Sequence, residues 1–70
     1  MNIKFNIDQK VYYLDIETGA VESDTVASAH VVKLDSQVKV IYELAESGTF
    51  PEPALFSCEL QCKEFYRKIL

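Results

Sequence analysis

The stretch from Val38 to Leu44 constrains the fold of this chain more than any other. Its even-numbered residues are all apolar, whereas two of its three odd-numbered residues are charged: Val38, Val40, Tyr42 and Leu44 alternate with Lys39, Ile41 and Glu43. Successive side chains of a strand point to opposite faces, so this pattern predicts a strand with one buried face. Ile41 is then the only apolar residue on its outer face.

A partner for this strand precedes it in the chain. Residues 20–34 are rich in valine, with the polar run Glu22-Ser23-Asp24 as an interruption, which predicts one long bent strand or two short ones. The short polar link Asp35-Ser36-Gln37 joins the two stretches. We therefore expect an antiparallel hairpin with its even-numbered side chains inward.

Further strands are predicted on both sides of this hairpin. Residues 4–14 carry apolar and β-branched residues and predict the first strand, and Gly19 favours a turn over residues 15–19. Residues 45–54 contain Pro51 and Pro53, which indicates a loop or an edge segment. Leu55-Phe56 is then available to close the sheet.

The last segment has the pattern of a helix. Ser57 is a plausible N-cap, Glu59 stands near the expected N-terminus, and basic residues stand near the C-terminus. Apolar residues recur at the spacing of one helical stripe, which we expect to cover one end of the sheet: Cys58, Cys62, Phe65, Tyr66 and Ile69.

With 70 residues, the chain has room for one hydrophobic core. We therefore predict a single domain over residues 1–70, mainly β, with a small antiparallel barrel of four to five strands over residues 1–56 and a C-terminal α-helix over residues 57–70. A chain of this size also gains stability from pairing, and an uncovered strand edge near residues 38–44 would allow a homodimer beside a monomer.

The order of these segments resembles a known class of proteins. An early Phe5-x-Ile7 and Val11-Tyr12-Tyr13-Leu14-Asp15 strand, a glycine-containing turn, valine-rich strands, then Val40-Ile41-Tyr42-Glu43-Leu44 and Glu52-x-x-Leu55-Phe56 before a helix is similar to the SH3-like (Tudor- and KOW-like) barrels of bacteria and their phages. The resemblance implies a non-catalytic module that binds peptides, modified tails or nucleic acid through loops and exposed aromatic residues.

Charge favours a protein partner over nucleic acid. The formal net charge is −4, with nine acids against four lysines in residues 1–57 and two acids against three bases in residues 58–70. Binding to phosphates requires clustered lysine and arginine. An acidic surface instead attracts a basic partner, although a solvated surface that only keeps the protein soluble has the same composition.

The residues that perform chemistry are few. His30 is the only histidine and is predicted to be structural or half-buried, and Cys58 and Cys62 are predicted to be free cysteines that pack the helix. No phosphate-binding glycine motif or calcium-binding loop occurs. We expect no enzyme activity, no catalytic or metal-binding residues and no cofactor; an enzyme using Cys58 with His30 is a third hypothesis.

Two adjacent tyrosines, Tyr12 and Tyr13, point to opposite faces of the first strand, so one is expected to be exposed. An exposed tyrosine suits a binding surface, but packing under the helix explains it equally well. Together with the acids of the turns and a loop aromatic, the tyrosines form the predicted partner-binding set: Tyr12, Tyr13, Glu17, Glu22, Asp24, Asp35, Glu46 and Phe50.

The resulting hypothesis is a non-enzymatic binding module that engages a basic protein surface through acidic loops and an exposed aromatic residue. Its sharper form is a phage-type inhibitor or regulator of a host nucleic-acid-binding or defence complex. The alternative is a Tudor- or KOW-like accessory domain that binds nucleic acid directly. Because no uncharged stretch approaches the roughly 20 residues of a membrane span, we expect no membrane partner and a cytoplasmic location.

Overall fold

The computed structural model of the chain describes residues 4–69, without the side chain of Ile69. Four strands form one antiparallel sheet in the order β1 (Lys10–Asp15), β2 (Ala20–Leu34), β3 (Gln37–Leu44) and β4 (Gly48–Pro51). A short 3-10 helix, η1 (Glu52–Ala54), and the helix α1 (Glu59–Ile69) follow. The mainly β architecture with one C-terminal helix is therefore confirmed, but the sheet is not closed into a barrel.

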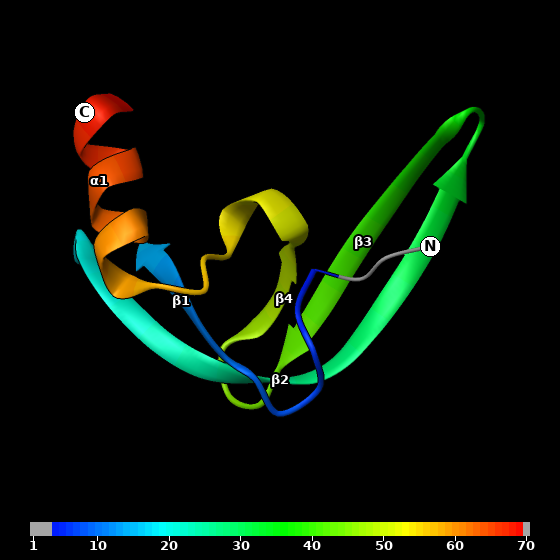
Figure 1. Cartoon of the computed structure of the whole chain (residues 1–70), viewed down its shortest axis with the longest axis horizontal. Coiled ribbons are helices and arrows are strands. Elements are labelled where there is room, and N and C mark those ends of the chain that lie inside the picture. The colour runs from blue at the N-terminus through cyan, green and yellow to red at the C-terminus, as the bar shows by residue number, and fades with distance from the viewer. Residues whose placement is uncertain (1–3, 70) are drawn as a thin grey trace.

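The predicted hairpin is present, and β2 is one long strand. Where β2 pairs with β3, its even-numbered side chains do not face inward as predicted, because the register places Val31, and not Val32, opposite Val40. Strand β2 pairs with β1 over its first half and with β3 over its second half, and an irregularity in register lies between Val26 and Ser28. This irregularity bends β2 between its two partners (Figure 1). Asp35, with a φ of 55°, and Ser36 form the turn to β3.

The first strand begins later than predicted. Residues 4–9 are bends and turns, and β1 starts at Lys10. Asp8 has a φ of 70°, and the Gln9 amide donates to the Asn6 carbonyl, which makes a tight turn there. Phe5 and Ile7 therefore do not share a strand face: Phe5 is buried and Ile7 is exposed.

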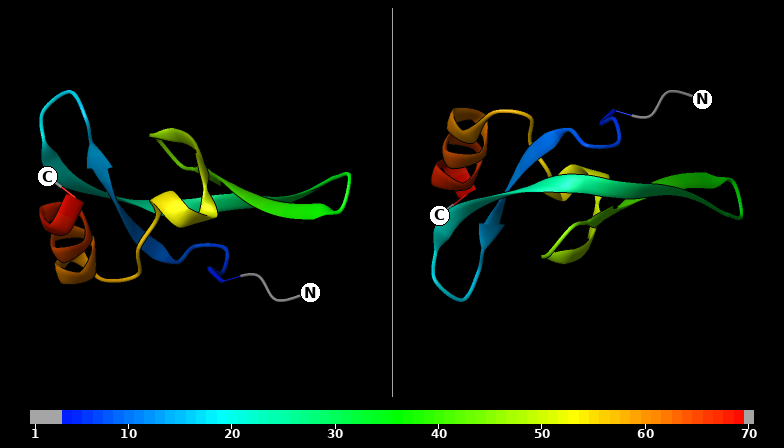
Figure 2. Two further views of the ribbon diagram at one scale, coloured as in Figure 1. Left: turned by 90° about the horizontal axis from the view of Figure 1, so that it is seen from above. Right: turned by 90° about the horizontal axis from the view of Figure 1, so that it is seen from below.

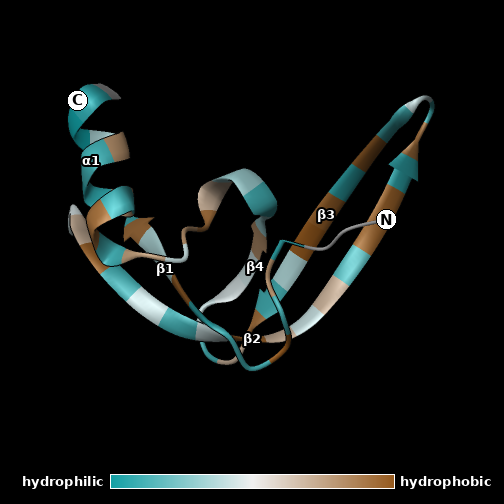
Figure 3. Cartoon of the chain, in the orientation of Figure 1, coloured by the Kyte–Doolittle hydropathy of each residue, from teal (hydrophilic) through white to brown (hydrophobic). Residues whose placement is uncertain are grey.

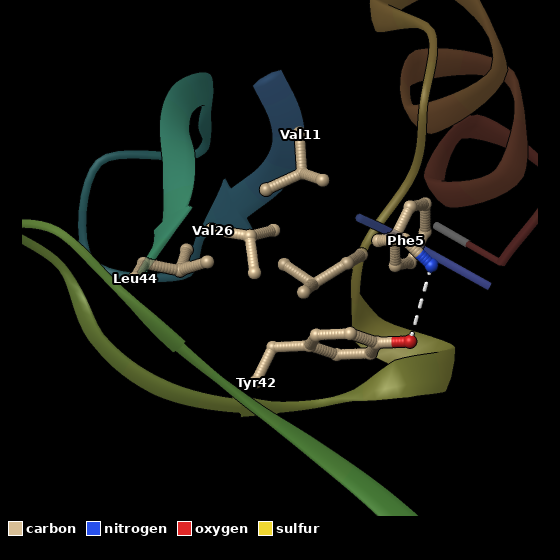
Figure 4. Packing of buried hydrophobic residues seen from close by; sticks show 6 residues of the cluster. Phe5, Val11, Val26, Tyr42 and Leu44 are labelled. Carbon is tan, nitrogen blue, oxygen red and sulfur yellow. Dashed lines mark hydrogen bonds between the residues drawn. The ribbon is translucent and has the colours of Figure 1, made fainter. Parts of the chain in front are cut away.

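The hydrophobic core lies where the bent sheet folds over itself (Figure 4). Tyr42 and Leu44 of β3 are buried and Val40 is half-buried, as the alternation predicts, whereas Val38 is exposed. The core cluster draws on five separate parts of the chain: Phe5, Val11, Val26, Tyr42, Leu44 and Leu55.

Tyr42 connects β3 to the N-terminal segment and to η1. Its ring meets the ring of Phe5 edge to face, with 5.3 Å between centroids. Its hydroxyl accepts a hydrogen bond from the Phe5 amide at 3.2 Å and donates one to Glu52 Oε2 at 2.6 Å. Burial, reinforced by the Glu52 carboxylate, raises the pKa of Tyr42 above its ordinary value.

The segment after β3 forms an edge strand, as predicted for residues 45–54. Gly48–Pro51 is an edge strand, β4, which pairs only with β3, so its proline removes no central hydrogen bond. After η1, Phe56 forms an isolated antiparallel bridge with Tyr12, with hydrogen bonds of 2.8 and 2.9 Å between their backbones. Leu55-Phe56 was expected to close the sheet, but it contributes only this isolated bridge to β1, and the sheet stays open.

Helix α1 packs against β1 and β2. It begins at Glu59, and the Cys62 amide donates to the Cys58 carbonyl, so Cys58 takes the place predicted for Ser57. Cys62 is buried and Tyr66 half-buried, but Cys58 and Phe65 are exposed, so only part of the predicted stripe is covered. The Ile69 side chain and residue 70 lie outside the described residues.

Candidate protein-binding surface

Tyr13 and Phe50 bring the two edge strands of the sheet together. Tyr13 belongs to β1 and Phe50 to β4, yet their ring centroids lie 4.7 Å apart with the planes tilted by 38°. The Tyr13 hydroxyl is hydrogen-bonded to Ser47 Oγ, with 2.8 Å between the oxygens. Both rings also pack against the core cluster, and this contact fixes their orientation.

A shallow depression of about 280 Å³ lies over this aromatic pair. The β1–β2 turn forms one side of it, and Ser47 of the β3–β4 turn forms another. Ile16, at 87% exposure, stands at the rim. The complete lining consists of Tyr13, Leu14, Asp15, Ile16, Glu17, Ser47 and Phe50.

Carboxylates surround the depression. Asp15 and Glu17 line it directly, Glu22 lies opposite Tyr13 in the β1–β2 register, and Glu46 adjoins Ser47. Neither of the two chain segments that build this region, residues 11–32 and residues 40–62, contains a lysine or arginine. The negative charge around the aromatic pair is therefore not neutralised by a base in the same segments.

Asp24 has a structural role beside this surface. Its carboxylate accepts hydrogen bonds from Ser47 Oγ at 2.7 Å, from the Ser47 and Glu46 amides at 2.8 and 2.9 Å, and from the Thr25 amide. The Ser47 hydroxyl, with help from these amides and against some desolvation, holds the pKa of Asp24 below its ordinary value. Asp24 thus fastens the β3–β4 turn to β2.

Five of the predicted partner-binding residues lie in one region: Tyr13, Glu17, Glu22, Glu46 and Phe50. Asp24 holds the adjoining β3–β4 turn in place through its hydrogen bonds. Asp35 is distant, in the β2–β3 turn. Tyr12 lies on the opposite face of β1, with Lys10 Nζ 5.6 Å from its ring centroid. Both tyrosines are half-buried, so neither is the freely exposed tyrosine that alternation alone predicts.

Sequence reasoning missed four residues of the depression: Leu14, Asp15, Ile16 and Ser47. The available signal was Ile16, an isoleucine inside an otherwise polar turn, where no core can cover it. Ser47 had no signal, because its contacts with Tyr13 and Asp24 bridge 34 and 23 positions in sequence.

The residues considered for catalysis are dispersed. His30 is exposed and not half-buried as predicted, because the irregularity after Val26 places it on the opposite face from that buried valine. Its Nε2 lies 3.2 Å from Ser28 Oγ, which also donates to Glu43 at 3.4 Å. Cys58 is exposed, contrary to expectation, whereas Cys62 is buried and burial raises its pKa. Residues 4–69 contain no group of three or more potential metal ligands.

Comparisons with known proteins returned no matching family model, no matching curated protein and no matching solved structure. Within the described part of the chain, the single α-helix has 11 residues, and no helix has the length and apolar character needed to span a membrane.

Proposed function

We propose that this chain is a non-enzymatic binding module of the SH3-like type and that it binds a basic segment of a protein partner at the depression over Tyr13 and Phe50. The observation that carries the proposal is a fixed aromatic pair surrounded by carboxylates, in two segments without any lysine or arginine. A lysine or arginine side chain fits such a site, because its charge is attracted by the carboxylates and by the ring faces.

The element order supports the SH3-like part of the proposal. One long bent strand, β2, pairs with β1 in its first half and with β3 in its second half. The 3-10 helix separates β4 from Phe56, which returns to pair with β1 at Tyr12. The contact between Tyr13 and Phe50 brings the edge strands β1 and β4 toward each other, as in a half-open barrel.

The test uses a short peptide of alternating lysine, arginine and glycine as the probe. Binding is measured by NMR titration of the ¹⁵N-labelled chain, and we expect shifts confined to residues 13–17 and 46–50. The double variant Glu17→Gln/Glu46→Gln should weaken binding by about tenfold. Its matched control, Glu59→Gln/Glu64→Gln, removes the same charge from α1, which does not line the depression, and should change the affinity by less than about twofold.

Equal losses in the two double variants would contradict a localised site and leave only a general attraction between opposite charges. A Phe50→Leu variant separates the aromatic contribution from the charge, because it keeps an apolar side chain in place and removes the ring. We expect it to weaken the peptide several-fold without changing the salt dependence of binding.

A partner surface that itself binds nucleic acid has the matching positive charge. The sharper form of the proposal is therefore a regulator that competes with nucleic acid for such a surface. Capture of partners from lysate of the native host, with and without nuclease, distinguishes the possibilities. A nuclease-resistant complex that Glu17→Gln/Glu46→Gln loses supports the proposal, whereas recovery that nuclease abolishes favours the alternative of direct nucleic-acid binding.

A further inference from the structure

The far half of the β2–β3 hairpin projects from the rest of the molecule. We call residues 30–41 the arm; its tip extends away from α1 and η1 in all three views (Figures 1 and 2). Several apolar side chains on it have little cover, and brown segments alternate along both of its strands (Figure 3). Val31 and Val38 are each 46% exposed and Leu34 is 56% exposed. A two-stranded hairpin alone is only marginally stable in water, so the arm benefits from a partner.

One edge of the arm is open along its length. In the described part of the chain, β1 pairs with β2 only as far as Thr25, residues 8 and 9 bond to Val26, and no strand follows beyond that point. The edge of β3 predicted to be uncovered is in fact paired with β4 from Ile41 to Leu44, which leaves only residues 37–40 free. The longer unpaired edge therefore belongs to β2.

The open edge of β2 is complementary to itself. The two-residue turn pairs Leu34 with Gln37, and the closing pair of such a turn shares hydrogen bonds. Because bonded pairs alternate, the backbone groups of Ala29, Val31 and Lys33 point away from β3 toward the open edge. A two-fold axis through Val31 places each of these residues opposite an equivalent one: Val31 faces Val31 of a second copy, and Ala29 faces its Lys33.

Charge also favours a second copy over other occupants. The arm holds Lys33 and Lys39 against Asp35, so its formal net charge is +1, and the rest of the chain carries −5. Two copies of an acidic chain repel each other at most surfaces. At the arm they meet where acidic residues are few, and each Lys33 lies opposite Ala29 and not opposite the Lys33 of the other copy.

We propose that two copies of this chain pair through the arm, with the two β2 edges antiparallel about Val31, to form one continuous sheet across a symmetric homodimer. The arm residues of each copy then lie in a sheet of at least four strands, and the depression over Tyr13 and Phe50 stays accessible at both ends. This pairing does not depend on the proposed binding of a basic partner.

The test measures mass by light scattering over concentrations from about 10 µM to about 1 mM, a range that spans weak protein dimers. We expect a concentration-dependent rise from monomer to dimer. Val31→Lys should weaken association by at least about tenfold, because a charge on a strand edge opposes edge-to-edge pairing. Val38→Lys is the matched control, since Val38 has the same residue type and exposed fraction on the other strand, and it should change association by less than about threefold.

Amide exchange provides a second readout that does not require a variant. The Ala29, Val31 and Lys33 amides should become slower to exchange as concentration rises, while the amides of the β1–β2 turn do not change. Added salt should strengthen the dimer, because it screens repulsion between two chains of net charge −4.

Three results would overturn the proposal. The first is a monomeric mass at every concentration. The second is dissociation caused by Val38→Lys and not by Val31→Lys, which would assign the contact to β3. The third is protection of the Ala29, Val31 and Lys33 amides that is independent of concentration, which would mean that the edge is covered within one chain. A far-UV spectrum of each variant confirms that the sheet is retained.

Discussion

The arm and the rest of the molecule, which we call the body, share the strands β2 and β3, but they are stabilised in different ways. In the body, Tyr42 and Leu44 of β3 are buried by residues from both ends of the sequence. In the arm, Val38 continues the same alternation only a few positions away and is 46% exposed. Alternation therefore specifies which face of a strand is apolar, whereas burial depends on whether another segment reaches that face.

The largest expected effect on stability comes from replacing a leucine in the core, compared with the same replacement in the arm. Leu55→Ala, in the core, should lower the free energy of unfolding by about 2–5 kcal/mol, because it leaves a cavity beside Val26 and Tyr42. Leu34→Ala, at the arm, should change it by no more than about 0.5 kcal/mol in dilute solution. Urea denaturation followed by tyrosine fluorescence measures both values. Similar losses for the two variants would mean that the arm is as well packed as the body.

A smaller loss of stability is expected when the hydroxyl of Tyr42, which joins β3 to Phe5 and Glu52, is removed. Tyr42→Phe removes the hydroxyl that accepts from the Phe5 amide and donates to Glu52, which leaves a buried donor without an acceptor. The cost should be about 1–3 kcal/mol by chemical denaturation. Tyr13→Phe is the control, because it also removes a hydrogen-bonded hydroxyl, but one bonded to the half-buried Ser47 rather than to a buried amide.

The same tyrosine makes a prediction for alkaline pH. Its pKa is raised in the folded state above the ordinary value of 10.0, so the stability it contributes is fully present below that pH and is lost as the pH rises through the folded-state pKa. Burial raises the pKa of Tyr66 in the same way. Melting temperature should therefore fall above about pH 10, and it should fall less steeply in Tyr42→Phe than in the unchanged chain.

The smallest effect concerns the β3–β4 turn. Asp24→Asn weakens four hydrogen bonds to a charged acceptor and should cost about 1–2 kcal/mol, whereas Glu22→Gln, at an exposed acid of the same strand, should cost almost nothing. Because the pKa of Asp24 is lowered, its contribution is present above the ordinary value of 3.8 and is lost as the pH falls below it. Denaturation curves between about pH 2 and pH 6 should therefore converge for Asp24→Asn and the unchanged chain at the acid end.

Local patterns in the sequence predict much of the fold. The period of two in β3, the turn at Gly19 and the helical spacing near the C-terminus each depend on residues a few positions apart, and each corresponds to an observed element. The errors arise where one residue changes the geometry of its neighbours. Positive φ at Asp8 delays the start of the first strand to Lys10, and the irregularity after Val26 moves His30 to the other face.

The candidate site was less predictable because it depends on contacts between distant segments. Tyr13 and Phe50 could be named from residue type, but their contact follows from the curvature of the sheet, which no short pattern encodes. Asp24 was assigned to the binding surface for its charge, whereas the Ser47 and Glu46 amides require that charge inside the fold. Composition identifies charged and aromatic residues, but it does not distinguish those used for structure from those free to bind.

The two-residue turn at the tip of the arm also bears on how the chain folds. Hairpins of this kind form within about 1–10 µs, since their first contacts join residues close in sequence. Closure of the body requires Phe5 to meet Tyr42, 37 positions away, and contacts of such long range slow folding. The topology thus favours an order in which the most exposed part of the molecule forms first and its best-buried part last. On the ribosome, the arm is synthesised before Phe56 and α1, so its open edge is available to other chains before the body is complete.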